Sequence, residues 1–269
     1  MINQALAAWY HRTNRPVPWR ALRDPWPILV SEVMAQQTQL ARVVPAWEKF
    51  MARFPDPAAL AGADMAELIE LWAGLGYQRR ALNLRRAAAE IAEHGWPTTA
   101  TGLVSLPGVG PYTAAAVACF AFGEPVPAID TNLRRVLSRW EGRPLAGKAL
   151  TESAWRHLDR DRPATWNQAV MDLGATVCRP TEPRCDVCPV HEWCADPSVY
   201  VPPPRQARYQ GSVRQARASV MKTLAGGPID LEALAGRLGI EQDRLERAVA
   251  DLESEGAVTR IGSTVTLGR

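Results

Sequence analysis

Four cysteines in one short stretch constrain this chain more than any other feature. Their spacing is C-x6-C-x2-C-x5-C, formed by Cys178, Cys185, Cys188 and Cys194. Thiolates this close together can enclose one soft metal centre. The irregular gaps fit a loop wrapped around a cubane [4Fe-4S] cluster better than the paired knuckles of a zinc ribbon. A zinc site is the alternative, and two disulfides are disfavoured because nothing else in the chain indicates secretion.

The length and composition are those of a globular protein. The 269 residues, 47% of them hydrophobic, allow one large domain and a small one. No apolar stretch approaches the ~20 residues that cross a bilayer, and the N-terminus lacks a targeting pattern. We therefore expect a cytoplasmic protein without a membrane partner, in a reducing compartment where thiolates persist. The fifth cysteine, Cys119, lies in an alanine-rich run and is expected in the core.

The charge gives only weak evidence for an anionic partner. The net charge is +3, and the only lysines are Lys49, Lys148 and Lys222. Arginine grips phosphate with a planar fork, so its excess suits nucleic acid. A GC-rich coding bias, also visible in the many alanines and prolines, accounts for most of this excess.

Helical periodicity dominates the chain before residue 257. Residues 24–27 stop one segment, and the expected helices, separated by glycine and proline, are 28–50 with a break at Pro45, 64–71, 79–93, 113–122, 132–140, 150–158 and 166–177. These helices and the cysteine loop at 178–194 make up a predicted all-α domain over residues 1–197.

A separate small unit is predicted after a proline-rich linker at 198–211. Helices are expected at 213–225, 231–238 and 241–255, followed by an alternating hairpin that turns at Gly262-Ser263. Three helices and a hairpin make residues 212–269 resemble a winged helix. Such units bind DNA, or they mediate protein contacts or only pack, and we weigh these alternatives about evenly.

A glycine-rich turn precedes the helix expected at 113–122. Gly108 and Gly110 let the backbone turn sharply and present bare N–H groups, and the helix that begins near Thr113 adds its positive N-terminus. Alone this would be an ordinary turn. In one chain with the cysteine loop it is typical of a helix-hairpin-helix, which holds the DNA backbone without reading its sequence.

Together these motifs resemble the helix-hairpin-helix DNA glycosylases. The order is that of the superfamily: Ser31–Gln39, Leu71–Tyr77, Leu106–Gly110, Ile129–Asn132 and the four cysteines. The similarity covers about residues 1 to 200 and is closest to the MutY-type adenine DNA glycosylases. It implies a monomer that removes adenine mispaired with 8-oxoguanine or guanine from double-stranded DNA. A thymine or uracil mismatch glycosylase is the competing enzyme, and a DNA-damage-binding protein on the same scaffold is the competing non-enzyme.

The resemblance implies two catalytic carboxyl groups. Glu32 stands among apolar residues, where burial would raise its pKa and let it protonate the flipped adenine. Asp130 precedes the helix expected from Asn132, so the helix N-terminus would lower its pKa and keep it charged beside the positive sugar. Without the resemblance these residues would be a solvated carboxylate and an ordinary N-cap. Asn132 is expected to orient Asp130 or a water.

Tyr112 decides the expected reaction type. Related glycosylases that also cut the strand carry a lysine here, because a Schiff base with the opened sugar requires an amine. Tyrosine at this position predicts a monofunctional enzyme that leaves an abasic site. It occurs in adenine glycosylases and in a thymine-specific branch, so it does not fix the substrate.

The resemblance implies further contacts, and the sequence departs from the family at two places. Gln37 and Tyr77 would wedge into the base stack, and Trp19 and Asp172 would form the adenine pocket, although core packing is the competing interpretation of both aromatic residues. Ala35 replaces a usual leucine of the wedge. The small C-terminal unit also replaces a MutT-like domain that recognises 8-oxoguanine. Either the catalytic domain senses the lesion alone, or the preference for 8-oxoguanine is reduced.

Overall fold

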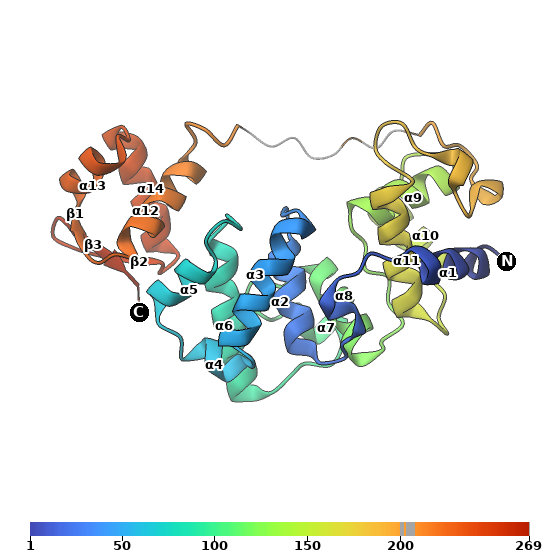
Figure 1. Cartoon of the computed structure of the whole chain (residues 1–269), viewed down its shortest axis with the longest axis horizontal. Helices are drawn as coiled ribbons and strands as arrows, with labels where there is room; N and C mark the ends of the chain where they lie inside the picture. Colours follow the sequence, from blue (N-terminus) through green and yellow to red (C-terminus); the bar gives the residue numbers. More distant parts are fainter. Residues whose placement is uncertain (200–201, 203–207, 269) are drawn as a thin grey trace. The chain divides into compact units, whose positions relative to one another are not determined.

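The computed structural model describes residues 1–199, 202 and 208–268. Its elements are almost all helices, which confirms the predicted all-α class with a small hairpin (Figure 1). Part of the predicted linker at 198–211, namely residues 200–201 and 203–207, lies outside the described residues. Within the described part of the chain, no helix has the length and apolar character that a membrane crossing requires.

Contacts divide the chain into two compact units. The first comprises Met1–Glu32, Pro97–Ser105 and Val109–Arg205, and the second comprises Val33–Trp96, Leu106–Gly108 and Gln206–Arg269. Helix α2 (Pro25–Ala35) contributes residues to both.

The first unit is built around α9 (Thr131–Trp140) and α11 (Pro163–Thr176), which pack against each other, and α1 (Ile2–Thr13) packs on α11. Their core contains Leu133, Trp140 and Trp166, each at most 7% exposed. The elements of this unit are α1 (Ile2–Thr13), η1 (Pro18–Ala21), α7 (Ala100–Leu103), α8 (Pro111–Phe122), α9 (Thr131–Trp140), α10 (Gly147–His157), α11 (Pro163–Thr176), η2 (Cys185–Val187) and η3 (His191–Trp193).

The second unit joins four helices of the N-terminal half to the C-terminal elements. The helices of the N-terminal half are α3 (Leu40–Arg53), α4 (Pro57–Ala61), α5 (Met65–Leu71) and α6 (Arg79–His94). The C-terminal elements are α12 (Val213–Leu224), β1 (Ile229–Asp230), α13 (Leu231–Leu238), α14 (Gln242–Ser254), β2 (Val258–Ile261) and β3 (Thr264–Leu267). The strands form an antiparallel sheet in the order β1-β3-β2, with Val258 opposite Leu267. The predicted three helices and hairpin are confirmed, and β1 was not predicted.

The expected break at Pro45 is wrong, because α3 runs through this proline. Pro45 costs the helix one backbone hydrogen bond, but Val43, Trp47 and Phe50 bury the apolar face of α3 and hold it together. The chain breaks earlier instead, between α2 and α3, where Gln37 takes the left-handed conformation at φ 56°. Helix α2 also begins at Pro25, three residues before the expected start, since proline is tolerated in a first turn. Helices α1, α4 and α7 were not predicted.

Candidate active site

A carboxyl–phenol pair lies in the first unit. Glu32 comes from α2, and Tyr112 is the second residue of α8. The Tyr112 hydroxyl donates a hydrogen bond to Oε2 of Glu32 at 2.8 Å. Burial raises the pKa of Glu32 to about 7, although the hydrogen bond from Tyr112 opposes the rise. Glu32 can therefore hold a proton near neutral pH, as its apolar neighbours in the sequence predicted.

Asp130 is the N-cap of α9. Its Oδ1 accepts from the backbone N–H of Leu133 at 2.6 Å, and its Oδ2 accepts from Nδ2 of Asn132 at 2.7 Å. The predicted orienting contact between Asn132 and Asp130 is therefore present. The predicted direction of the pKa shift is wrong: burial raises the pKa of Asp130, and the hydrogen bonds from Leu133 and Asn132 only oppose that rise. The negative charges of Asp130 and Glu32 also interact, because Asp130 helps to raise the pKa of Glu32.

Arg135 supports the Asp130 carboxylate through Asn132, and the sequence analysis did not identify it. It is 5% exposed, and its Nη2 donates to Oδ1 of Asn132 at 2.8 Å. Its Nε donates to the carbonyl of Cys178 at 2.8 Å. A Cβ at Gly174 would approach Asn132 Cβ to 2.6 Å, so a glycine is required where α11 passes α9. An arginine three residues after Asn132 was the available signal, since such residues share a helix face.

A buried ion cluster surrounds Asp172. This carboxylate is 1% exposed and accepts from both Arg15 and Arg20, with Oδ1 2.5 Å from Nε of Arg15 and Oδ2 2.7 Å from Nη1 of Arg20. Burial alone would raise its pKa, but the hydrogen bond and charge of Arg20, with Arg15, hold it below the ordinary value. Asp172 therefore supports the two arginines. Arg20 also acts electrostatically on Glu32, and Trp19 beside it is buried.

The glycine-rich turn joins α7 to α8. Gly108 takes φ 76°, and a Cβ there would meet Asn83 Cβ at 2.6 Å, so this position needs glycine. Gly110 is the N-cap of α8 without a side-chain cap. Thr113, also predicted to bind DNA, is 2% exposed in the first turn of α8.

The two predicted wedge residues lie in the second unit, both with left-handed backbones, Gln37 at φ 56° and Tyr77 at φ 49°. Arg80 holds their loops. Its guanidinium donates to carbonyl oxygens on both sides, including Gln36 at 2.7 Å and Gly76 at 3.1 Å. Left-handed backbones held by one arginine, with Gln37 exposed and Tyr77 half-buried, fit two rigid loops better than core positions.

The four cysteines of the predicted cluster loop have free thiols and line one pocket. Arg139, also in its wall, donates from Nη1 to Sγ of Cys178 at 3.1 Å. Within the described residues, no group of three or more His, Cys, Asp or Glu side chains is gathered tightly enough for a single ion. Four thiolates are the donor set of a [4Fe-4S] cluster and also of a structural zinc site.

Comparisons with known proteins identify the class. A model of the HhH-GPD superfamily of base excision DNA repair proteins matches residues 30–157. A thermostable thymine-DNA glycosylase superposes with a TM-score of 0.68 at 28% identity, covering 71% of this chain and 93% of that one. An endonuclease III in a DNA complex, 22% identical with a TM-score of 0.63, shares the fold. The chain is a helix-hairpin-helix base excision repair glycosylase.

Curated relatives narrow this assignment. The adenine DNA glycosylase of Mycobacterium tuberculosis is 40% identical over 274 residues, covering 95% of this chain and 89% of the relative. The human adenine DNA glycosylase is 36% identical over 253 residues, covering 87% of this chain and 44% of its own length. The chain belongs to the adenine DNA glycosylase family. The similarity also extends beyond residues 1–200, on which the resemblance in the sequence rested.

Proposed function

We propose that this protein excises adenine mispaired with 8-oxoguanine or guanine in duplex DNA by monofunctional hydrolysis of the N-glycosidic bond. The observation that carries this proposal is the pairing of Glu32, whose pKa is about 7, with a second carboxyl group, Asp130, that accepts two hydrogen bonds. Depurination needs one carboxylic acid and one carboxylate. The family of the chain supplies adenine as the base.

Glu32 is the general acid. Tyr112 donates to Oε2, which leaves Oε1 of Glu32 to carry the proton. Transfer of that proton to a ring nitrogen of adenine weakens the glycosidic bond, whose electron pair then leaves with the base. Burial and the nearby carboxyls raise the pKa of Tyr112 well above its ordinary value, so the phenol stays protonated and keeps donating.

Asp130 stabilises the sugar. Hydrogen bonds from Leu133 and Asn132 favour its ionised form and hold it in place, so its charge can face the positive C1′ atom. Water then adds to C1′ and releases a proton, leaving an abasic site. Trp19 and Arg20 form the wall of the adenine pocket, and the buried Asp172 holds Arg20 in place through two hydrogen bonds.

The four cysteines hold a [4Fe-4S] cluster in this proposal. The cluster gives structural and electrostatic support, since hydrolysis transfers no electrons. Arg139 bonds the Cys178 sulfur, and Arg135 bonds the Cys178 carbonyl, so the protein ties the cysteine loop to α9 on its own.

Single-turnover excision tests this function. Labelled duplexes with A opposite 8-oxoguanine, A opposite G, and T opposite G are incubated with the protein and then split into samples with and without alkali. Strand cleavage at A that requires alkali is the expected result. Cleavage at T would assign the chain to the thymine branch, to which the thymine-DNA glycosylase of similar structure belongs by name. Cleavage without alkali would contradict a monofunctional reaction.

A further inference from the structure

A groove in the second unit brings the C-terminal elements next to a predicted wedge residue. It has a volume of about 760 Å³ and lies between α12 and the loop that carries Gly74 to Gln78. The charged residues in its lining are three cations, Arg42, Arg214 and Lys222, and one carboxylate, Glu70. The groove therefore carries an excess of positive charge.

Arg214 binds Tyr77 directly. Its Nη1 donates to the Tyr77 hydroxyl at 2.8 Å, and its guanidinium carbon lies 5.2 Å from the centre of the Tyr77 ring. The same carbon lies 5.3 Å from the centre of the Tyr209 ring. Two tyrosines and an arginine thus stand at one wall of the groove. Aromatic rings and guanidinium planes are the surfaces on which nucleic-acid bases and backbones rest.

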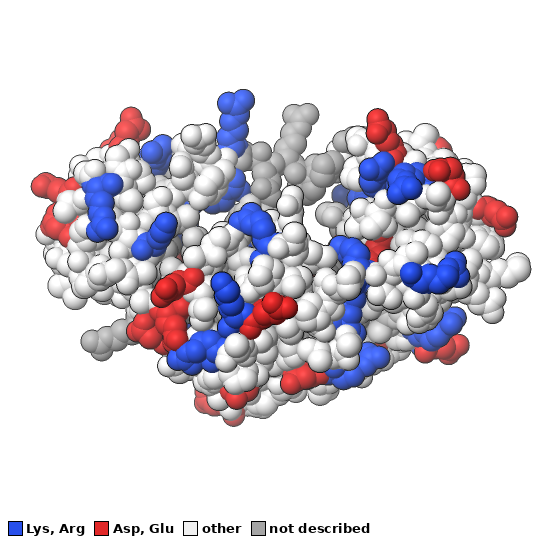
Figure 2. Space-filling view, in the orientation of Figure 1, with Lys and Arg blue, Asp and Glu red and all other residues white. Residues whose placement is uncertain are grey.

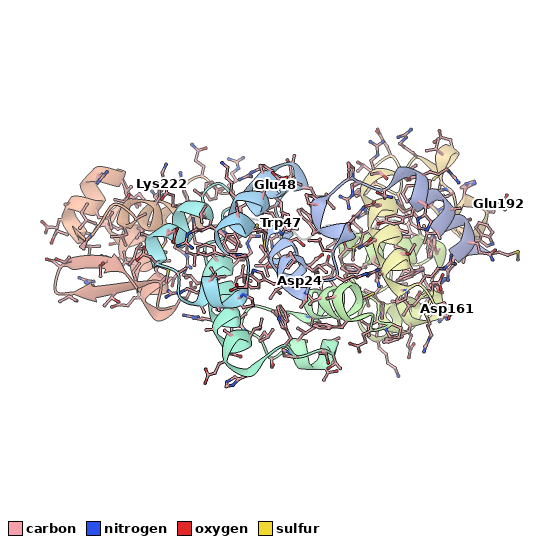
Figure 3. All side chains as sticks on the ribbon, turned by 60° about the horizontal axis from the view of Figure 1, so that its bottom comes forward. Asp24, Trp47, Glu48, Asp161, Glu192 and Lys222 are labelled. Atoms are coloured by element: carbon pink, nitrogen blue, oxygen red, sulfur yellow. The ribbon has the colours of Figure 1, made fainter. Side chains whose placement is uncertain are left out.

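Polar contacts fix α12 in this position. Glu255, after α14, accepts from Arg217 of α12 at 2.6 Å and lies 3.7 Å from Arg79 of α6. Arg86 of α6 also donates to the Glu255 carbonyl. Arg217 is therefore engaged in holding α12. The two other cations of α12, Arg214 and Lys222, line the groove. Figure 3 marks Lys222 on α12, beside α5.

The C-terminal elements from α12 to β3 are not arranged to recognise DNA in the manner of an independent winged helix. In a helix-turn-helix the second helix enters the major groove. Here that helix is α14, which carries four acidic residues, Asp243, Glu246, Asp251 and Glu253, and two arginines, Arg244 and Arg247. Its net negative charge would be repelled by phosphates. Helix α12 carries no acidic residue.

We infer that the groove binds the DNA sugar-phosphate backbone on the strand whose base lies opposite the excised adenine. This inference rests on the proposed function and on the resemblance described above, which implies that Gln37 and Tyr77 wedge beside that base. Arg214 donates hydrogen bonds to Tyr77 and to a phosphate at the same time, because a guanidinium carries five donors. Lys222 and Arg42 bind further phosphates. The face shown in Figure 2 mixes both signs of charge, so the evidence for an anionic ligand lies in the groove and not in the whole surface.

The test uses the full-length protein and salt-dependent DNA affinity. The probe is a short labelled duplex with 2′-fluoro-deoxyadenosine opposite guanine, whose glycosidic bond resists cleavage. The variant is Arg214→Ala with Lys222→Ala. The matched control is Arg237→Ala with Arg247→Ala, which removes the same charge from exposed positions of α13 and α14 outside the groove. A second variant, Arg214→Lys with Lys222→Arg, keeps both charges.

The Arg214/Lys222 alanine variant is expected to bind about tenfold more weakly or worse, because charge-assisted hydrogen bonds are lost. The slope of log affinity against log salt should fall by about 0.9 for each phosphate contact removed. The control and the charge-retaining variant should keep the wild-type slope. An unchanged slope in the alanine variant, or an equal fall in the charge-retaining one, would overturn the inference. Wild-type protein that binds this duplex but excises no adenine from the same duplex made with ordinary deoxyadenosine would instead contradict the proposed function.

Discussion

The hydroxyl of Tyr112 donates a hydrogen bond to the carboxyl of Glu32, with 2.8 Å between the two oxygens. The two residues are 80 positions apart in the chain and come from different helices. This contact fixes one oxygen of the carboxyl and lowers its pKa against the larger effect of burial. In the proposed mechanism it thereby sets which oxygen of Glu32 carries the proton and the pH at which that proton is held.

Replacing Glu32 with glutamine should abolish excision and leave DNA binding intact. The amide keeps the shape and can still accept from Tyr112, but it cannot donate a proton as an acid. We expect single-turnover excision to fall at least about a hundredfold, the usual contribution of a general acid. Glu48→Gln, at an exposed position of α3 (Figure 3), makes the same change at a residue that is not part of the proposed site and should retain the wild-type rate. Equal rates for the two variants would remove Glu32 from the mechanism.

The rate of excision should fall as the pH rises through about 7. In the proposed mechanism Glu32 acts in its protonated form. Its pKa is raised from 4.5 to about 7, so the acid is fully present well below pH 7 and is lost as the pH rises through that value. In Tyr112→Phe the hydrogen bond that lowers this pKa is missing, and the falling limb should move to higher pH. Single-turnover rates of the wild type and of Tyr112→Phe across the pH range measure the falling limb of each protein. A limb that moved to lower pH in Tyr112→Phe would contradict this assignment.

Asp130 has a structural and a proposed catalytic role, which two substitutions separate. Asn can still cap α9 through its side-chain oxygen but carries no charge, whereas Ala removes both. Asp130→Asn should therefore lose excision with little change in melting temperature, and Asp130→Ala should also lose about 1 kcal/mol of stability. Thermal denaturation and excision assays measure the two effects. Activity retained in Asp130→Asn would show that only the cap matters.

Asp172→Asn should be among the more destabilising single changes in the first unit. It leaves Arg15 and Arg20 without their buried counter-charge, and breaking such a pair costs about 3–5 kcal/mol. Glu67→Gln removes a carboxylate from an exposed pair with Arg53 and should cost less than about 1 kcal/mol. Urea denaturation of both variants gives the comparison. Similar losses would mean that the Asp172 cluster is not the buried ion pair described above.

Each cluster cysteine should be needed for iron binding, while Cys119 should not. Cys119 is buried beside Asn167, outside the pocket that the other four line. Cys188→Ser should lose iron, sulfide and visible absorbance, and Cys119→Ala should retain them. Metal analysis of protein purified without oxygen also distinguishes iron from zinc. Zinc in place of iron would contradict the proposed cluster.

Local patterns in the sequence determined much of this protein. Apart from α7, the helices from 64 to 177 and the three C-terminal helices follow from apolar spacing and caps, as Asp64 before α5 and Asp130 before α9 illustrate. The cysteine spacing and the glycine-rich turn are equally local. The resemblance to the glycosylases supplied the names of the candidate catalytic residues, which stay predictions until excision is measured.

Only the tertiary structure decided how these residues act on one another. Asp172 lies 157 positions from Arg15 and 152 from Arg20, and no local pattern predicts that the three are buried together. The sequence predicted a lowered pKa for Asp130, whereas the structure raises it. The helix N-terminus is a local effect that the sequence reveals, but burial depends on the whole fold. No local pattern predicted the contact of Arg214 with Tyr77 either, since the two residues are 137 positions apart. Desolvation and ion pairing depend on distant segments, so the sequence determined the elements and the fold determined their chemistry.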